Sequence, residues 1–332
     1  MKKLLSVILA LVMILSLSTV AFAETTDPSE STVYRDVDTV TLTKEYKLAN
    51  NGTTSPAETF TFSGLTCTEV KDAGVGVTVE NAPVPTIGSV EYASGEAGSA
   101  NATRTVTITL PKYEAVGVYT YTFKETDGKT AGVTYRTEDI TLVVTVIEQN
   151  GKVRVAAVHT ENAGGDKSGK FDNTYSAGSL SVKKIVTGNM GDKEKGFDVT
   201  VTFTAPEGKT VKEAIKYTVG TEEKSILASD WKQGSASAKI TLKHGQTITF
   251  TNIPYGVSYT VVEDTYDDYK TTYEGANGTI NSAEATATIT NNKGGKVDTG
   301  IVLDSMPYVL LLAVAAMGLA VLLTKKRASR ED

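Results

Sequence analysis

The sequence predicts an all-β fold made of two tandem β-sandwich domains. The body of the chain is rich in Thr, Val and Tyr, and turn residues recur about every 8–12 positions, as in sandwich proteins. Several segments alternate apolar and polar residues, the period of a half-buried strand. The clearest are TRTVTITL (103–110), GVYTYTFKE (117–125), ITLVVTVIE (140–148) and KVRVAAVHT (152–160). A break at NTYSAGS (173–179) separates two halves near Ala177.

Local signals refine this picture at three places. Asn150-Gly151 stands between two alternating segments and predicts a type I′ hairpin turn. Asn277-Gly278 suggests a second turn of the same kind. Residues 211–217 (VKEAIKY) form the one segment of the body for which we predict a short helix.

The N-terminus has the pattern of a secretory signal peptide. Lys2 and Lys3 precede an apolar run, and Ala21-Phe22-Ala23 supplies the small residues of a cleavage site. We expect residues 1–23 to be removed after Ala23. The alternative is an N-terminal membrane anchor, but the apolar run is short for that role.

The C-terminal segment, 294–332, has the pattern of a membrane span with a basic tail. Residues 306–323 carry no charge, which is about enough to cross a bilayer. Lys325, Lys326 and Arg327 follow at once, and positive charge marks the cytoplasmic side. The body is therefore expected outside the cell, as two domains, 24–176 and 177–293. A permanent single-helix membrane protein is the alternative.

Composition excludes several classes of function. The net charge is −6 with no basic block outside the tail, so we expect no nucleic-acid partner. Cys67 is the single cysteine, so the exported body contains no internal disulfide. His159 and His244 are the only histidines and stand far apart, so we expect neither a metal site nor any cofactor. Neither histidine lies in a catalytic-triad signature.

A lysine stands where the alternation predicts a core residue. In LSVKK, Leu180, Val182 and Lys184 share the apolar face, while Lys183 faces solvent. The first half repeats the pattern in TVTLTK, which places Lys44 on its own apolar face. Burying an unpaired ammonium destabilises the fold by several kcal/mol, roughly, and each half of the chain would carry this cost.

Each lysine has the same two companions downstream. A Tyr-rich strand runs into Glu125 in the first half and into Glu263 in the second, 81 and 79 residues after the lysine. Each half then closes on a short strand that carries an asparagine, Asn173 or Asn291. Two buried ion pairs, each with a capping asparagine, would be the plainer interpretation, but buried pairs of this kind are costly.

These three residue types allow one reaction inside an apolar core. Desolvation lowers a lysine pKa and raises a glutamate pKa, which yields a neutral amine and a carboxylic acid. The amine attacks the asparagine side-chain carbonyl, which we expect the acid to polarise, and ammonia leaves. The product is a neutral isopeptide bond, formed once, with the protein as its own substrate. We therefore expect no enzyme in the ordinary sense.

The whole mature chain resembles the two-domain streptococcal major pilins, the backbone subunits of sortase-assembled pili. The likeness lies in TLTKEYK, GVYTYTFKET, KFDN, LSVKKIV, YTVVED and TITN, in order through both halves. It implies Ig-like (CnaB-like) β-sandwich domains, each with a self-formed Lys–Asn bond aided by a glutamate. Carried over by motif, the implied sets are Lys44–Asn173 with Glu125, and Lys184–Asn291 with Glu263.

The resemblance also implies a sortase and covalent polymerisation. The related pilins carry a V-P-T-G motif before the span, and this chain has Val297-Asp298-Thr299-Gly300. Cleavage is expected between Thr299 and Gly300, and Asp298 in place of proline leaves the class of sortase open.

The Thr299 carboxyl would then join a lysine of the next subunit. In the family that lysine lies just before the first-domain asparagine, a position that falls on Asp166 here. Lys167 is our first candidate and Lys170 the second. A plain solvated loop lysine is the alternative for each.

Two other features suggest different chemistry. Cys67 could form a thioester, as in some pilus-tip adhesins, but a buried small apolar residue is the simpler interpretation. Asp264, Asp267 and Asp268 could bind calcium, although their spacing is not that of an EF-hand, and a solvated acidic loop is the default.

The sequence thus predicts an exported pilus backbone subunit on a Gram-positive surface, held briefly in the membrane by residues 306–323. Its expected partners are sortase, neighbouring subunits, peptidoglycan or an anchoring pilin, and a possible host ligand. The first alternative is a wall-anchored stalk or adhesin that is not polymerised. The second is a surface enzyme, for which no pair of catalytic groups stands together in the sequence.

Overall fold

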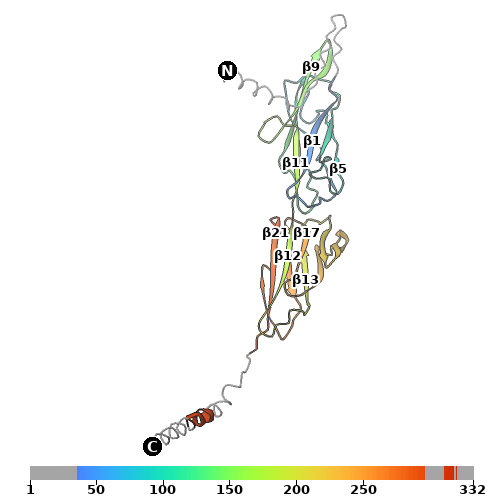
Figure 1. Ribbon diagram of the computed structural model, residues 1–332. Coiled ribbons are helices and arrows are strands. Elements are labelled where there is room, and N and C mark those ends of the chain that lie inside the picture. Colours follow the sequence, from blue (N-terminus) through green and yellow to red (C-terminus); the bar gives the residue numbers. More distant parts are fainter. Residues whose placement is uncertain (1–35, 296–309, 318, 320–332) are drawn as a thin grey trace, which may run out of the picture.

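The chain forms two β-sandwiches that follow one another end to end (Figure 1). The computed structural model describes residues 36–295, 310–317 and 319. The sheets divide between β11, which ends at Tyr175, and β12, which begins at Ala177. We call the two sandwiches the N-terminal and the C-terminal domain.

The N-terminal domain packs a five-stranded sheet, in the order β4-β6-β1-β11-β8, against a four-stranded sheet, in the order β10-β9-β7-β3. A separate two-stranded ribbon pairs β2 with β5. The strands are β1 Thr39–Leu48, β2 Glu58–Phe60, β3 Thr66–Lys71, β4 Thr86–Ile87, β5 Val90–Tyr92, β6 Thr103–Thr109, β7 Gly117–Phe123, β8 Val133–Thr134, β9 Ile140–Gln149, β10 Lys152–Glu161 and β11 Lys170–Tyr175.

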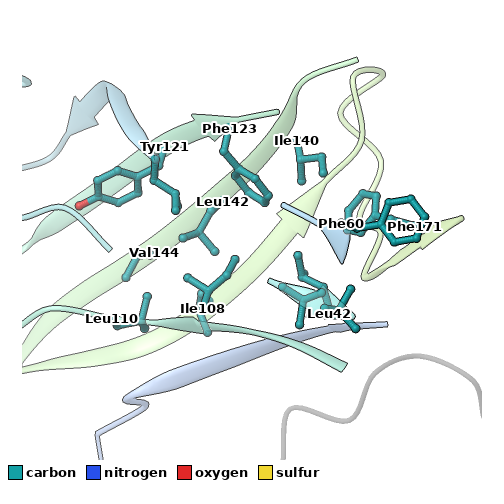
Figure 2. Close-up of a cluster of buried hydrophobic side chains, with 14 of the residues drawn as sticks. Leu42, Phe60, Ile108, Leu110, Tyr121, Phe123, Ile140, Leu142, Val144 and Phe171 are labelled. Carbon is teal, nitrogen blue, oxygen red and sulfur yellow. The ribbon is translucent and has the colours of Figure 1, made fainter. Parts of the chain in front are cut away.

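Alternate residues of both sheets point inward and meet as the core of this domain (Figure 2). Leu42 of β1 and Ile108 of β6 come from one sheet, and Phe123 of β7 and Leu142 of β9 from the other. All four are buried, and their neighbours along each strand are more exposed. The period-2 pattern of the sequence therefore corresponds directly to the two faces of each sheet.

The C-terminal domain repeats the plan with a six-stranded sheet, in the order β15-β14-β17-β12-β21-β19, and a four-stranded sheet, in the order β16-β13-β18-β20. One short 3-10 helix, Ala228–Asp230, follows β15. The strands are β12 Ala177–Thr187, β13 Phe197–Thr204, β14 Ile215–Val219, β15 Glu222–Ile226, β16 Ser235–Leu242, β17 Thr247–Pro254, β18 Ser258–Glu263, β19 Lys270–Glu274, β20 Asn277–Thr279 and β21 Glu284–Asn292.

In each domain the first and last strands of the larger sheet lie side by side and run parallel. β1 pairs with β11, and β12 pairs with β21, whereas the other strand pairs of the described residues are antiparallel. This arrangement brings the beginning and the end of each domain's chain together in the middle of one sheet.

Polar contacts join the two domains at the point where the chain crosses between them. Asn50 Nδ2 donates to the Ala177 carbonyl at 2.7 Å and to the Tyr255 hydroxyl at 2.8 Å. The Asn252 side chain accepts from the Thr54 amide at 2.9 Å. Asn252 is buried and has a φ of 62°, a conformation that asparagine tolerates better than most residues.

A second group of contacts lies beside the first. Thr130 and Thr210 form a strand-like bridge across the joint. Lys212 Nζ donates to the buried Glu58 carboxylate at 3.0 Å. Gly132, with a φ of +78°, has no room for a side chain, because a Cβ would lie 2.6 Å from the Ser176 carbonyl oxygen. The joint is therefore a close-fitting polar contact.

Two of the local predictions are wrong. Residues 211–217 do not form a helix: Ile215 begins strand β14 and is buried in the C-terminal core, where it requires an extended backbone. Asn277-Gly278 does not form a turn but lies within β20, opposite β18. Gly278 is small because a Cβ there would lie 3.0 Å from the Tyr259 hydroxyl.

The predicted turn at Asn150-Gly151 is confirmed. These two residues join β9 to β10 with φ values of 56° and 72°, as a type I′ turn requires.

Both predicted processing segments fall largely outside the described residues. Ala21, Ala23 and the sortase motif 297–300 lie there. Of the predicted span 306–323, residues 310–317 are helical. No helix among the described residues is long and apolar enough to cross a membrane.

Candidate functional site

The first site brings together Lys44, Glu125 and Asn173. Lys44 projects from β1 into the core and is 1% exposed. Its Nζ lies 2.6 Å from Glu125 Oε1 and donates a hydrogen bond to it. Asn173 Nδ2, on the neighbouring strand β11, donates to Glu125 Oε2 at 3.0 Å. One buried carboxylate therefore contacts both the lysine and the asparagine, as the sequence predicts.

Backbone groups hold this first site in place. Glu125 follows β7 in the opposite sheet, and its Oε2 also accepts from the Arg136 amide at 2.6 Å. Asn173 Nδ2 donates a second hydrogen bond to the Thr134 carbonyl at 2.9 Å. Sequence reasoning did not identify Thr134 or Arg136, since their contribution comes from the main chain.

The second site brings together Lys184, Glu263 and Asn291 in the same arrangement. Lys184 on β12 is 0% exposed, and its Nζ lies 2.6 Å from Glu263 Oε2. This close ion pair is not oriented as a hydrogen bond. Asn291 Nδ2 donates to Glu263 Oε1 at 2.6 Å, and the Thr271 hydroxyl donates to the same oxygen at 3.4 Å. Lys183 is exposed, as the alternation predicts.

The register of the parallel strands is the same in both sites. Asn173 lies opposite Tyr46, two residues beyond Lys44, and Asn291 lies opposite Val186, two residues beyond Lys184. Each lysine and asparagine are thus diagonal neighbours on one face of a sheet. The glutamate reaches both from the facing sheet.

Burial changes the acid–base chemistry of both lysines. Desolvation lowers the pKa of Lys44 and of Lys184 below the ordinary value, although the neighbouring glutamate partly opposes the change. Aromatic rings contribute to this burial, since Lys44 Nζ lies 4.7 Å from the centre of the Phe60 ring and Lys184 Nζ 4.3 Å from that of Phe197. A lowered pKa makes the neutral, nucleophilic form of the amine more accessible.

The contacts identify the side of each asparagine that meets the glutamate. In both sites the carboxylate contacts the amide nitrogen Nδ2, whereas Oδ1 of Asn173 and of Asn291 is buried with no hydrogen-bond partner. The glutamate therefore does not contact the carbonyl oxygen, which we expected it to polarise. The glutamate is placed instead to protonate the nitrogen that leaves as ammonia.

The two candidate linking lysines differ in their surroundings. Lys170 begins β11, and its Nζ pairs with Glu45 at 2.6 Å, which raises its pKa. Lys167 is exposed, and among the described residues its side chain has no ion pair or hydrogen bond. Its loop is fixed by Asn162 Oδ1, which accepts from the Gly164 and Asp166 amides at 2.8 and 3.0 Å.

The other candidate residues take part in ordinary structural contacts. Cys67 is buried on β3, and burial raises the pKa of its thiol. Asp264 and Asp268 form ion pairs with Lys239 and Lys293 at 2.9 and 3.1 Å. Across 36–295 and the short described part of the tail, no cluster of three His, Cys, Asp or Glu residues could hold a metal ion.

A tandem β protein with a buried Lys–Glu–Asn trio in each domain has the pattern of isopeptide-containing surface proteins, and one of the two family models that match the chain describes such a domain. Residues 40–176 match a family described as a Spy0128-like isopeptide-containing domain, FctA. Residues 178–293 match DUF7601, a domain of unknown function. The first match covers the residues of the first site. The second covers all of the second site, to which that family's description gives no role.

Comparison with known proteins is more specific. A pilin from Streptococcus pyogenes serotype M1 is 30% identical over 333 residues, or 93% of this chain and 96% of that protein. The crystal structure of the major pilin from S. pyogenes superimposes with a TM-score of 0.53 at 28% identity, over 78% of this chain and 99% of that chain. The pilus tip adhesin Cpa from S. pyogenes is 28% identical over 132 residues, 38% of this chain and 18% of the adhesin.

The chain belongs to the family of streptococcal major pilins. Its likeness to the first pilin runs through nearly the full length of both proteins, whereas its likeness to the adhesin is confined to a part. It is a structural subunit of a cell-surface pilus, and the subunits of such a fibre associate with one another.

Proposed function

We propose that this pilin is a covalently polymerised backbone subunit and that each of its domains closes a Lys–Asn isopeptide bond unaided. The observation that carries the proposal is the repeated diagonal of lysine and asparagine on parallel strands, with one glutamate contacting both. Chance would not place the same three residue types at the same register in two domains.

Lys44 reacts in the following steps, and Lys184 follows the same course. The ammonium gives a proton to Glu125, 2.6 Å away, and becomes a neutral amine. Nζ attacks the Cγ atom of Asn173, a bond forms between them, and the Cγ–Nδ2 bond breaks. Glu125, which contacts Nδ2 at 3.0 Å, gives its proton to the leaving nitrogen. As ammonia departs, Nζ passes its second proton back to Glu125, so the new amide is neutral and carries one hydrogen. The lysine and the asparagine are consumed, so the chain reacts once and has no turnover.

Intact mass tests this proposal directly. Residues 24–299, expressed alone, should be lighter than the sequence requires by the mass of two ammonia molecules. Glu263→Ala should restore one ammonia, and Glu125→Ala the other. Lys183→Ala, next to Lys184 but exposed, serves as the control and should leave both losses intact. An unshifted mass of the wild-type protein would falsify the proposal.

Sortase is the partner that we propose for polymerisation and for attachment to the wall. It would cleave after Thr299 and pass that carboxyl group to a lysine of the next subunit, after brief retention in the membrane by residues 306–323. Wall extracts should then contain a ladder of bands that resists sodium dodecyl sulfate. A single band of subunit size would favour the alternative, a wall-anchored stalk or adhesin.

Lys167 is the acceptor that we propose. It is exposed and unpaired within the described residues, on a loop held by Asn162, whereas Lys170 is paired with Glu45. Lys167→Arg should abolish the ladder, and Lys170→Arg, the matched control three residues away, should preserve it. The opposite pair of results would assign the linkage to Lys170.

A further inference from the structure

A small aromatic cluster covers the second site. Phe197, at the start of β13, is fully buried, and its ring centre lies 4.3 Å from Lys184 Nζ. With Val186 and Tyr269 it forms a cluster of buried residues separate from the main core of the domain, and Tyr266 packs against it. The Lys184 amine therefore lies under its own aromatic cover.

The two tyrosines come from the loop that follows Glu263. This loop, residues 264–269, runs from β18 in one sheet to β19 in the other, where Thr271 pairs with Asn291. Tyr266 and Tyr269 both meet the Phe197 ring edge-on, with ring centres 5.0 and 5.2 Å away. Edge-to-face contacts of this kind are favourable for aromatic side chains.

Hydrogen bonds fix both tyrosine rings, one against strand β13 and the other against the loop that precedes it. The Tyr266 hydroxyl accepts from the Asp198 amide at 2.9 Å, and the Tyr269 hydroxyl accepts from the Asp192 amide at 3.1 Å. The Tyr269 amide in turn donates to the Tyr266 carbonyl at 2.9 Å, which closes a turn between the two rings. The loop is thus tied to both sides of Phe197.

Two lysines pack against the same rings. Lys195 Nζ lies 4.5 Å from the centre of the Tyr266 ring and 5.3 Å from that of Tyr269. Lys293 Nζ lies 5.5 Å from the Tyr269 ring and pairs with Asp268 at 3.1 Å. Cation–π contacts of this length favour the arrangement of the two tyrosine rings.

We propose that Phe197, Tyr266 and Tyr269 form an aromatic cap that excludes water from Lys184 and so sets the rate at which the Lys184–Asn291 bond forms. This inference rests on the proposed function of the second site. Phe197 contacts the reacting amine directly, and the two tyrosines are positioning residues that hold its ring in place. Water that reached the amine would stabilise the ammonium, which is unreactive.

The charged groups near Lys184 lie around the cap, whereas the Phe197 ring lies directly over its amine. Glu263 is the one carboxylate in contact with Lys184 among the described residues. Lys195 Nζ lies 5.6 Å from the centre of the Phe197 ring, and His244 Nδ1 accepts from the Val186 amide at 2.9 Å. Other charged groups on the elements around the cap include Asp192, Asp198, Asp264, Asp267, Asp268 and Lys293.

The test measures the rate of bond formation and its dependence on pH. Residues 24–299 are synthesised in a short cell-free pulse and then held at a series of neutral to alkaline pH values. Loss of ammonia and the crosslinked Lys184–Asn291 peptide are followed by mass spectrometry. The Lys44–Asn173 bond of the same molecules is an internal reference.

Phe197→Ala should form the second bond roughly tenfold more slowly at neutral pH, and the pH of half-maximal rate should rise by about one unit, because each unit of lysine pKa changes the neutral fraction tenfold. The Tyr266→Phe and Tyr269→Phe double variant should move both quantities in the same direction by a smaller amount. Tyr217→Phe, a half-buried tyrosine on β14, is the matched control and should change neither.

The outcomes separate the cap from the proposed function. A wild-type chain that never forms the second bond contradicts the proposed function. If the wild-type chain forms the second bond and Phe197→Ala forms it with the same rate and pH profile, the proposed role of the cap is overturned. Slowing by one constant factor at every pH would mean that Phe197 only stabilises the fold, and this also overturns the cap. Should Phe197→Ala not fold, Phe197→Leu and the tyrosine double variant decide by the same criteria.

Discussion

The two sites contain the same three residues in the same register but are held in different ways. In the first site, the Arg136 amide and the Thr134 carbonyl fix Glu125 and Asn173 through the main chain. In the second, the Glu263 carboxylate contacts, among the described residues, only the Thr271 hydroxyl, at 3.4 Å, besides Lys184 and Asn291. The first site is thus organised by the backbone, and the second depends on side chains and on its cap.

The aromatic rings that lie over the two lysines also differ in how they are held. Phe60, over Lys44, belongs to the main core of the N-terminal domain, and its ring centre lies 5.2 Å from that of Tyr46 and 5.7 Å from that of Tyr92. Phe197, over Lys184, belongs to a small separate cluster. The same trio of residues is thus covered by the domain core in one domain and by a single loop in the other.

The largest expected effect comes from removing either crosslink. Asn173→Ala and Asn291→Ala each prevent one bond and leave the lysine–glutamate pair in place. Since the two bonds close loops of about 130 and about 110 residues, the free energy of unfolding of the domain concerned should fall by roughly 4–5 kcal/mol. Calorimetry should show a lower transition temperature for the N-terminal domain in Asn173→Ala and for the C-terminal domain in Asn291→Ala. If either variant lowered both transitions equally, the assignment of one crosslink to each domain would be contradicted.

A smaller effect on stability should distinguish Phe60 from Phe197, the two rings that lie over the lysines. In the Asn173→Ala background, Phe60→Ala should cost about 3–5 kcal/mol of unfolding free energy, the usual cost of a Phe deletion in a main core. In the Asn291→Ala background, Phe197→Ala should cost about 2 kcal/mol, since its cluster is small and can collapse. Urea unfolding measures both, and an equal cost would mean that the cap is part of the main core.

Stability should also depend on pH when the crosslink is absent. In Asn173→Ala, burial lowers the pKa of Lys44 in the folded state below its unfolded value of 10.5, so the unfolded chain binds more protons between the two values. Stability should therefore rise with pH through that window, by about 1.4 kcal/mol for each unit of the shift. Lys44→Met in the same background removes the titration, and a rise that persists there would come from other groups.

The smallest expected effect concerns Thr271. Thr271→Val removes the weak hydrogen bond to Glu263 and should slow the second bond about threefold, with the first bond unchanged. Thr272→Val, on the other face of β19, is the control and should leave both rates as they are. A pulse-chase experiment followed by mass spectrometry compares the four rates.

The sequence was sufficient for the fold class and for the six residues that meet in the two sites. Alternation placed Lys44 and Lys184 on buried faces, because a strand exposes its side chains with a period of two. Repetition of the pattern then supplied the glutamates and asparagines. The parallel register that makes lysine and asparagine diagonal neighbours depends on long-range pairing, which local periodicity does not contain.

Other features could not be predicted for identifiable physical reasons. The Arg136 amide and the Thr134 carbonyl act through the main chain, which every residue possesses. Lys212 contacts a buried carboxylate of the other domain, so its role depends on the joint. The helix expected at 211–217 followed local propensity, which the burial of Ile215 in strand β14 overrides.

The near-continuity of β11 and β12 has a mechanical consequence. They are separated by Ser176 alone, whose amide and carbonyl are both hydrogen-bonded, to Gly132 and Tyr255. If subunits join through Lys167 and Thr299, tension runs along β11, through Ser176, along β12 to Lys184, and across the amide to Asn291. The second isopeptide bond then lies in series with the load, while the first lies beside it and fastens β11 to β1. Tensile strength would reside in the second bond, and resistance to bending in the contacts around one serine.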